Sequence, residues 1–478
     1  MTKLLRSARW LATVLVVLFL TIYFVRAFDS RRLPEPGPEH RIEFESEFEA
    51  SQEDDTDWQQ YLEIEDRLAA ELAEKVPGGE RSPNMVDRYT PGSLTSPESF
   101  PSNWNHSYVL SVSSPRGVAV LLHGLSDSPY SMLSTAETMV AAGYNVVVPR
   151  MPGHGFAAGG LRAVSWEDWM AAVRVAVRHA ATLPGSEQGL IVVGYSNGGL
   201  LAVEYGMICG ESDDLQCPKG IVLMSPAIAV SPFAAVANLH SAVSWMPYFE
   251  HFQWESILPE VDPFKFTSFP KRAGWEIHKM AKHTQKMLAQ PAVAETLPPI
   301  LTFQSAIDRT INARAVVDIL FDTLPANGSE LVVYDVNRNS DHLLLMKTAP
   351  ADIAAWLEAM APLDFSVTLL RNSDPESEAL EAWRIAAGDT KGSSNPTTLR
   401  WPGQVYSLSH IALPFPPENP LYGDGSATEG GTGIVLGALA PRGERGMLRL
   451  SADYFMRTRF NPFFSYQAER LTEWLEEL

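Results

Sequence analysis

The feature that most constrains this chain is a serine set between two glycines where an apolar run meets a helical pattern. The run "LIVV" (190–193) is typical of a buried strand, "GYSNG" (194–198) follows it, and "GLLAVEYG" (199–206) is typical of a helix. A sharp strand-to-helix turn holds its central side chain clear of the sheet, and glycines are needed beside it because a Cβ would collide with neighbouring backbone. We therefore expect Ser196 to be a nucleophile, the alternative being an ordinary serine in a glycine-rich turn.

Apolar runs that alternate with helical patterns surround this turn and predict a parallel sheet covered by helices on both faces. The alternation of strands and helices stops after Ile228. Residues 229–296 are rich in Trp, Phe and Tyr and predict an inserted, mostly helical cap. Beyond the last run, "FSVTLLRN" (365–372) and "ESEALEAWRIAAG" (376–388) are expected to add a strand and a helix. The runs interpreted as strands include "GVAVLLHG" (117–124), "YNVVVPRMPGHG" (144–155), "GIVLMSPAI" (220–228), "PPILTFQSAID" (298–308) and "ELVVYDVN" (330–337).

A serine nucleophile that attacks a carbonyl also needs two backbone N–H groups to hold the oxyanion. Asn197 follows Ser196 at the start of a helix, where the helix dipole favours negative charge, and supplies one of them. We expect the second from Leu125, in the loop after "GVAVLLHG". His123, in the same loop, is expected to shape it rather than to carry protons.

Four stretches resemble the α/β-hydrolase superfamily, specifically its monoglyceride-lipase and serine-aminopeptidase-like branch: "HGLSDSPYSM" (123–132), "PRMPGHG" (149–155), "WEDW" (166–169) and "GYSNGG" (194–199). The resemblance implies an eight-stranded, mostly parallel sheet, a helical cap after the sixth strand and a Ser-Asp-His triad in that chain order. It makes His154 a loop-shaping residue. The expected organisation is an N-terminal membrane anchor or signal segment (1–27), an acidic linker with an amphipathic helix (28–104), the hydrolase core (105–360, cap about 229–296), and a C-terminal extension completing the sheet and terminal helix (361–478).

The resemblance places the triad acid after the strand that follows the cap. Asp308 ends that strand, and its expected role is to orient the histidine; its alternative role is a helix cap, and Asp322 and Asp335 are weaker candidates. Two histidines fit the base. His342 has the family's usual spacing and context, whereas His410 lies in "VYSLSHIALPFPPENPLYG" (405–423), which resembles a segment of a bacterial subgroup with a long C-terminal part. We favour His410 and keep His342 as the alternative.

The expected reaction is hydrolysis of carboxylic esters through an acyl-enzyme, with no metal or cofactor, because the chain has no HExxH, phosphate-loop or dinucleotide GxGxxG motif. Aromatic residues of the cap offer an apolar wall for an acyl chain, or else build the cap's own core. A lipophilic ester is therefore the expected substrate, of the carboxylesterase, monoacylglycerol-lipase or lysophospholipase kind. A peptidase or thioesterase on the same triad and a catalytically silent, envelope-anchored binding module are the alternatives. The cap aromatics are Trp245, Tyr248, Phe249, Phe252 and Trp254.

The N-terminus predicts a single membrane anchor, with a cleaved signal peptide as the alternative. A basic start precedes "WLATVLVVLFLTIYFV" (10–25), whose sixteen uncharged residues span about 24 Å as a helix. Cys209 and Cys217 lie in one polar loop and are expected to form a disulfide, which would place the globular part outside the cytoplasm. The net charge of −20 excludes nucleic acid as a partner, and the acidic run 43–57 is interpreted as a solvated linker.

Overall fold

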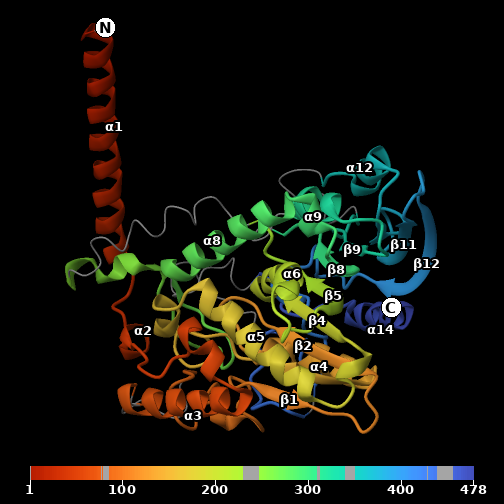
Figure 1. Ribbon diagram of the computed structural model, residues 1–478, viewed down its shortest axis with the longest axis horizontal. Coiled ribbons are helices and arrows are strands. Elements are labelled where there is room, and N and C mark those ends of the chain that lie inside the picture. Colours follow the sequence, from red (N-terminus) through yellow and green to blue (C-terminus); the bar gives the residue numbers. More distant parts are fainter. Residues whose placement is uncertain are drawn as a thin grey trace.

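The computed structural model describes residues 2–76, 78, 86–229, 247–308, 313–339, 350–427, 429–438 and 456–478. Within these residues the core is a ten-stranded sheet in the order β1-β3-β2-β4-β5-β8-β9-β10-β11-β12 (Figure 1). The strands from β3 to β10 in this order run parallel, and β1, β11 and β12 are antiparallel to their neighbours. The predicted α/β fold with a mostly parallel sheet is confirmed. The strands are β1 (Tyr108–Leu110), β2 (Gly117–Leu122), β3 (Tyr144–Val148), β4 (Leu190–Tyr195), β5 (Pro218–Met224), β8 (Ile300–Ser305), β9 (Glu330–Tyr334), β10 (Ser366–Asn372), β11 (Ala379–Ile385) and β12 (Ser393–Arg400).

Helices cover both faces of this sheet, as continuous apolar strands require. On β2, Val118 and Val120 face one hydrophobic core and Ala119 and Leu121 face another. The first core contains α3 (Trp58–Lys75), α5 (Trp166–Thr182), α6 (Asn197–Ile208) and α8 (Lys271–Leu288), and the second contains α4 (Leu133–Ala141) and α14 (Phe464–Glu477). Shorter helices are α2 (Pro38–Arg41), α9 (Pro291–Ala294), α10 (Ala313–Ala315) and α12 (Ile353–Met360).

The C-terminal part widens the sheet beyond the eight strands that the resemblance implied. The segment expected to form a helix at 376–388 instead contains β11, which pairs antiparallel with β10. Its apolar side chains alternate between the two cores, Leu380 facing one and Trp383 and Ile385 the other. Pairing and burial on both faces therefore outweigh the helical propensity of this segment.

The acidic segment before α3 is not a solvated linker. Phe48 is fully buried against Tyr61 of α3, and Glu47 forms an ion pair at 2.8 Å with Arg150, which follows β3 and has no exposed surface. Glu65 of α3 lies 3.4 Å from the same guanidinium, and the Tyr61 hydroxyl donates to the Arg150 carbonyl oxygen at 2.6 Å. These contacts hold both N-terminal segments against the sheet because a buried cation needs paired acids.

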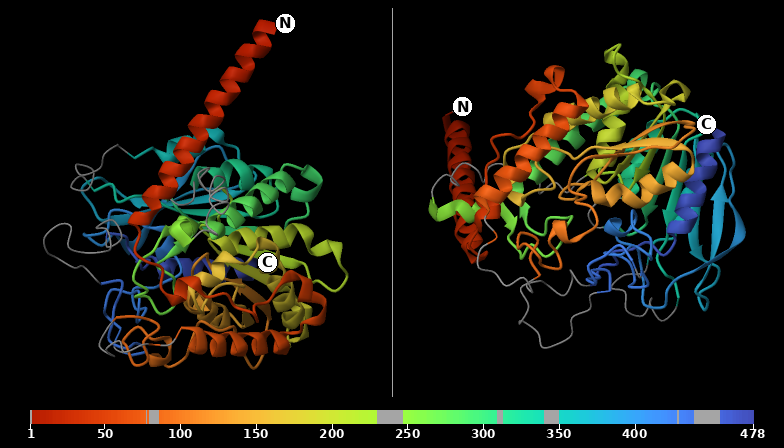
Figure 2. Two further views of the ribbon diagram at one scale, coloured as in Figure 1. Left: turned by 90° about the vertical axis from the view of Figure 1, so that its left-hand side faces the viewer. Right: turned by 90° about the horizontal axis from the view of Figure 1, so that it is seen from below.

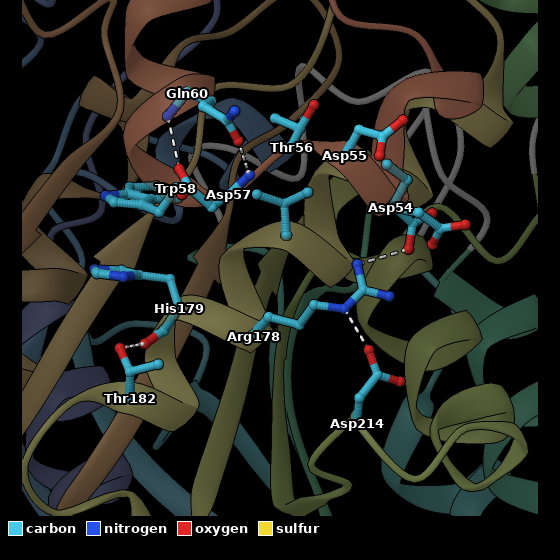
Figure 3. A pocket seen from close by; sticks show the side chains of 12 residues that line it. Asp54, Asp55, Thr56, Asp57, Trp58, Gln60, Arg178, His179, Thr182 and Asp214 are labelled. Atoms are coloured by element: carbon cyan, nitrogen blue, oxygen red, sulfur yellow. Dashed lines mark hydrogen bonds and ion pairs between the residues drawn. The ribbon is translucent and has the colours of Figure 1, made fainter.

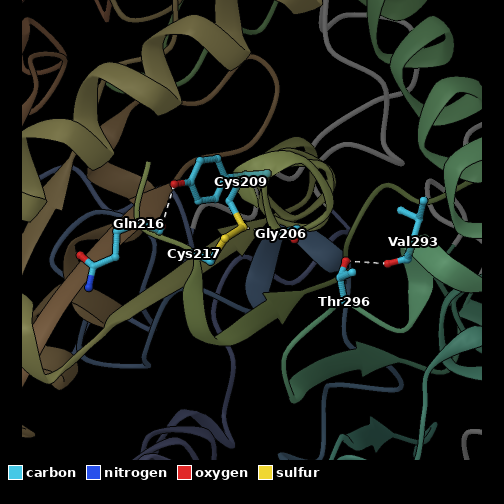
Figure 4. Close-up of a disulfide and its surroundings, with 7 residues drawn as sticks. Gly206, Cys209, Gln216, Cys217, Val293 and Thr296 are labelled. Carbon is cyan, nitrogen blue, oxygen red and sulfur yellow. Dashed lines mark hydrogen bonds between the residues drawn. A yellow bond between two sulfur atoms is a disulfide. The ribbon is translucent and has the colours of Figure 1, made fainter. Parts of the chain in front are cut away.

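A disulfide joins Cys209, at the end of α6, to Cys217, just before β5 (Figure 4), and confirms the predicted pairing. Beside it, the Tyr205 hydroxyl of α6 donates to the Gln216 carbonyl oxygen at 2.8 Å. The bridge joins two residues that are eight positions apart and ties the helix after the serine turn to the next strand.

Helix α1 (Thr2–Asp29) projects from the body as an exposed apolar rod (Figures 1 and 2). Within the described residues, Arg6–Arg32 is the one helix long and apolar enough to cross a membrane, a property that signal sequences share. Its lower end contacts the cap, where the rings of Tyr23 and Phe252 lie 5.5 Å apart. The apolar N-terminal helix that the sequence indicates is therefore present.

The buried ion pairs of Arg150 predict a large stability cost for its removal. Arg150→Met leaves Glu65, which is 1% exposed, without its cation, and should lower the free energy of unfolding by about 3–5 kcal/mol. Arg116→Met is the control, because Arg116 is exposed and meets Glu476 only at 4.0 Å; it should cost less than about 1 kcal/mol. Urea unfolding followed by tryptophan fluorescence measures both, and equal costs would contradict the role given to Arg150.

The disulfide predicts a smaller cost. The double substitution Cys209→Ser with Cys217→Ser should lower the free energy of unfolding by about 2.5 kcal/mol, because it removes the constraint that a short closed loop places on the unfolded chain. Thermal unfolding with and without reductant measures the effect. A wild-type transition that reductant leaves unmoved would show that the bridge does not form.

Candidate active site

Ser196 occupies a strained turn between β4 and α6. Its backbone has φ +55° and ψ −112°, a conformation that residues with side chains rarely adopt. The Ser196 N–H donates to the Met224 carbonyl oxygen of β5 at 2.9 Å, and its own carbonyl oxygen accepts from Gly199 and Leu200. Hydrogen bonds to the next strand and to the following helix thus maintain the strained backbone, a pattern that is typical of functional sites.

The glycines around Ser196 are required by close backbone approach. A Cβ on Gly194 would overlap the carbonyl group of Gly198, and a Cβ on Gly198 would overlap the carbonyl group of Leu122 at the end of β2. The reason given from the sequence, collision with a neighbouring strand or helix, is therefore confirmed at both positions.

The structure brings Asp308 and His410 together. Asp308 follows β8 and its side chain is 1% exposed; its Oδ1 lies 3.6 Å from the Nδ1 atom of His410. The His410 segment is attached to the same strand, since the Ser305 hydroxyl of β8 donates to the Leu408 carbonyl oxygen at 2.8 Å. The ring of His410 lies 6.5 Å from that of Tyr195, the residue before Ser196, so that an acid, an imidazole and the serine turn share one edge of the sheet.

The other two candidates for the acid lie elsewhere. His342, the alternative base, lies outside the described residues. Asp335 is buried and engaged with Arg338 at 2.5 Å, while Asp322 lies in the turn Phe321–Thr323 and burial raises the pKa of its carboxyl. Of the three described acids, Asp308 is the one that lies close to His410.

Two cations lower the basicity of His410. Burial is the main cause of a pKa well below the ordinary histidine value, and Arg457 and Lys265 add to it by repelling the imidazolium. Lys265 is neutralised by Asp127, 2.7 Å away in the loop after β2. The Arg457 Nη2 lies 3.1 Å from His410 Nδ1. The sequence gives no signal for Arg457, because the two arginines of "YFMRTRF" (454–460) form no recognisable motif.

The loop after β2 is held by His123, which acts as a structural residue. Its Nδ1 lies 2.9 Å from the Gly124 carbonyl oxygen, and its Nε2 accepts from the Met151 N–H at 2.9 Å. Burial lowers the pKa of His123 to about 3, so the ring stays neutral, and the ring of His154 packs edge-on against it at 5.0 Å. Leu125 follows in this loop and is half-buried.

Asn197 begins α6, and the first N–H groups of a helix have no partner within it. The backbone N–H groups of Asn197 and Leu125 remain the candidates for binding an oxyanion. The start of α6 and the loop after β2, to which they belong, meet where Gly198 approaches the Leu122 backbone.

The cap aromatics form less of a substrate wall than expected. Trp254 belongs to the small hairpin of β6 (Trp254–Ser256) and β7 (Phe269–Pro270), is 1% exposed and packs edge-on against His40 at 5.0 Å. The ring lies among the residues of the first core, which agrees with the alternative that these aromatics build the cap's own core. Phe252 is fully buried as well. Trp245 lies outside the described residues, as do the side chains of Tyr248 and Phe249.

A second serine–histidine–carboxylate contact is structural. His40 Nε2 lies 2.9 Å from the Ser268 hydroxyl, and its Nδ1 lies 3.3 Å from Glu39. However, the Gly37 N–H donates to Nδ1 at 3.0 Å, so Nε2 carries the proton and cannot act as a base toward Ser268. Ser268 has no exposed surface and also contacts the backbone of Leu258.

A hollow of about 490 Å³ lies away from this chemistry, between the segment before α3 and helix α5 (Figure 3). Arg178 crosses it and pairs with Glu53 and Asp214, and Trp58 stacks on His179 at 5.0 Å. Two of its acids are thus neutralised by an arginine, and no group of three metal-ligating side chains occurs in the described part of the chain. The hollow is therefore a weaker candidate for an active site than the turn of Ser196.

Comparison with known proteins finds similarity over about half of the chain. The family model described as "serine aminopeptidase, S33" matches residues 113–345. A thermostable monoacylglycerol lipase of Bacillus sp. (strain H-257) is 26% identical over 229 residues, which are 48% of this chain and 83% of that protein. Among solved structures, the monoacylglycerol lipase of Paleococcus ferrophilus matches at 20% identity and TM-score 0.36, covering 48% of this chain and 89% of the other. A soluble variant of monoglyceride lipase from Saccharomyces cerevisiae matches at 13% and 0.38, covering 48% and 81%.

The contact between Gly198 and β2 predicts that one methyl group is not tolerated there. Gly198→Ala should lower the free energy of unfolding by at least about 3 kcal/mol, or abolish folding, because the Leu122 backbone cannot yield as a side chain would. Gly210→Ala is the matched control, since a Cβ there meets nothing within 4 Å, and its effect should stay within about 1 kcal/mol. Thermal unfolding compares the two, and a stable Gly198→Ala protein would contradict this packing.

Proposed function

Residues 113–345 form a monoglyceride-lipase-like α/β-hydrolase, and from this premise we propose that the chain is a serine hydrolase of lipophilic carboxylic esters. The observation that carries the proposal is the contact of Asp308 with His410 beside the strained turn of Ser196. A strained serine with no acid–imidazole pair at the same sheet edge would be an ordinary turn residue. Together the three residues have the composition of a catalytic triad.

In the proposed reaction, His410 Nε2 accepts the proton of the Ser196 hydroxyl as its oxygen attacks the ester carbonyl carbon. The N–H groups of Asn197 and Leu125 hold the oxyanion. His410 then gives its proton to the departing alcohol, which leaves the acyl group on Ser196. Water attacks this acyl-enzyme with His410 again as base, and the acid and free serine are released. Asp308 orients the imidazole and stabilises its charged form.

Two features support a lipophilic acyl group. The relative of similar sequence is a monoacylglycerol lipase, and the exposed apolar helix α1 contacts the cap through Tyr23 and Phe252. A bilayer around α1 would hold the cap close to lipid. We propose that α1 anchors the protein with its body outside the cytoplasm, which the Cys209–Cys217 bridge supports because disulfides persist in oxidising compartments.

The triad predicts active-site labelling. A fluorophosphonate probe should label the wild-type protein in detergent and should not label Ser196→Ala, because the probe reacts with an activated serine. Both proteins should show the same thermal transition. No labelling of the folded wild-type protein would favour the silent binding module, and turnover of peptides or thioesters above that of esters would favour a peptidase or a thioesterase.

The choice of base predicts different effects for the two histidines. His410→Ala and Asp308→Asn should lower kcat for p-nitrophenyl butyrate by about 10³-fold or more, whereas His342→Ala should keep activity within about threefold. The reverse result would move the base to His342.

The low pKa of His410 predicts an acidic limb at unusually low pH. The base works only when neutral, so activity is present above its pKa and is lost as pH falls through it. The limb of kcat/KM should therefore lie clearly below pH about 6.5. A limb at or above the ordinary histidine value would contradict the buried environment described for His410.

A further inference from the structure

The guanidinium of Arg457 contacts the Nδ1 atom of His410, which in a catalytic triad would contact the acid. Arg457 Nη2 lies 3.1 Å from Nδ1, whereas Asp308 Oδ1 lies 3.6 Å from the same nitrogen, beyond hydrogen-bond distance. A guanidinium carries donors and no acceptor, so Nδ1 must accept from it. The neutral imidazole then carries its single proton on Nε2.

This arrangement is the reverse of what the reaction requires. As a base, His410 needs a free lone pair on Nε2 and an N–H on Nδ1 that donates to Asp308. With Arg457 donating to Nδ1, His410 cannot take the proton of Ser196. Arg457 must leave Nδ1 before a turnover begins, and the proton must pass from Nε2 to Nδ1, for example through solvent.

The neighbourhood of His410 singles out Arg457 among its cations. Among the described residues, the charged and titratable groups near the ring are Asp308 after β8, Tyr195 of β4, Lys265 of the cap and Arg457 before α14. Lys265 is paired with Asp127 at 2.7 Å. Arg457 is exposed, and among the described residues no carboxylate lies within ion-pair distance of it.

Hydrogen bonds hold the backbone next to Arg457, while the residue itself is exposed. The Ser409 hydroxyl donates to the Thr458 carbonyl oxygen, and the Asn461 N–H donates to the Phe415 carbonyl oxygen at 2.7 Å. Next along the chain, Arg459 pairs with Asp262 at 3.2 Å and is buried. The Arg457 side chain can therefore change partners through its own rotamers without moving the loop.

We propose that Arg457 is a latch on His410 that an anionic group of the substrate releases, which makes the preferred substrates lipophilic esters with a phosphate or carboxylate on the alcohol side. This inference rests on the proposed function. An oxyanion binds a guanidinium more strongly than a neutral imidazole does, because both partners are charged and the contact can be bidentate. When Arg457 binds the anion, Nδ1 of His410 is free to take up the ring proton and to donate it to Asp308. Nε2 then has the free lone pair that the base needs, so substrate binding itself produces the active tautomer. Arg457 is a positioning and specificity residue in this scheme.

The test compares two substrates with the same acyl chain, a neutral 1-acylglycerol and an anionic 1-acylglycerol 3-phosphate, on the full-length protein in detergent. The wild-type protein should favour the anionic ester in kcat/KM by at least about tenfold, and Arg457→Gln should abolish that preference mainly by raising kcat for the neutral ester. Arg457→Lys keeps the positive charge but loses the bidentate guanidinium, so its preference for the anionic ester should lie between those of the wild-type protein and Arg457→Gln. Arg116→Gln, an exposed arginine before β2, is the matched control and should behave as wild type.

Two readouts separate a latch from a merely structural role. Removing the cation should raise the pKa of His410, so the acidic limb of Arg457→Gln on the neutral ester should move to higher pH. Equal losses on both substrates with an unmoved limb, or an unchanged substrate preference, would overturn the proposal.

A third arm distinguishes an anion carried by the substrate from a free one. Inorganic phosphate, added at constant ionic strength, should stimulate wild-type hydrolysis of the neutral ester only weakly. Strong stimulation in the absence of any preference for the anionic ester would overturn the assigned substrate class. Fluorophosphonate labelling of Ser196 keeps the two proposals apart, because its absence refutes the hydrolase itself, whereas labelling with unchanged preferences refutes only the latch.

Discussion

The structure depends on one close approach, in which the first turn of α6 lies against the end of β2 with no room for a methyl group between them. Gly198 makes that contact, and Gly194 makes the matching one inside the turn. The approach forces Ser196 into its strained backbone and brings the start of α6 beside the loop that contains Leu125. The positions of the proposed nucleophile and of the proposed oxyanion donors therefore depend on the same packing contact.

Around this contact, the chain uses buried polar groups to fix loops. His123 bridges the loop after β2 to the one after β3, and Arg150 binds the latter to the N-terminal segments through Glu47 and Glu65. The residues before the hydrolase core are thus part of its support. The disulfide does the same for the far end of α6.

Local patterns were enough to predict the parallel sheet, the serine turn with its glycines, the Cys209–Cys217 bridge and the structural role of His123. Each depends on residues close in sequence or on one strand-to-helix unit. The contact between Asp308 and His410 could be predicted only from the resemblance to α/β-hydrolases, because 101 residues lie between the two in the sequence.

The errors share a cause, which is that tertiary contacts decided the outcome. The acidic composition of residues 43–57 predicted a solvated linker, but Phe48 is buried and Glu47 pairs with Arg150. The helical propensity of residues 376–388 predicted a helix, but this segment forms β11 and pairs with β10. The role of Trp254 was left open between the substrate wall and the cap's own core, because composition cannot distinguish a core ring from a pocket ring. Arg457 was missed because its importance lies in one contact with His410 across the fold.

The most direct measurement is a crystal structure of the protein after reaction with a long-chain alkylphosphonate ester. This account predicts phosphorus bonded to Ser196 Oγ, the phosphonyl oxygen within hydrogen-bond distance of the Asn197 and Leu125 N–H groups, and His410 Nδ1 donating to Asp308. An adduct on another residue, or a different imidazole beside Ser196, would contradict it.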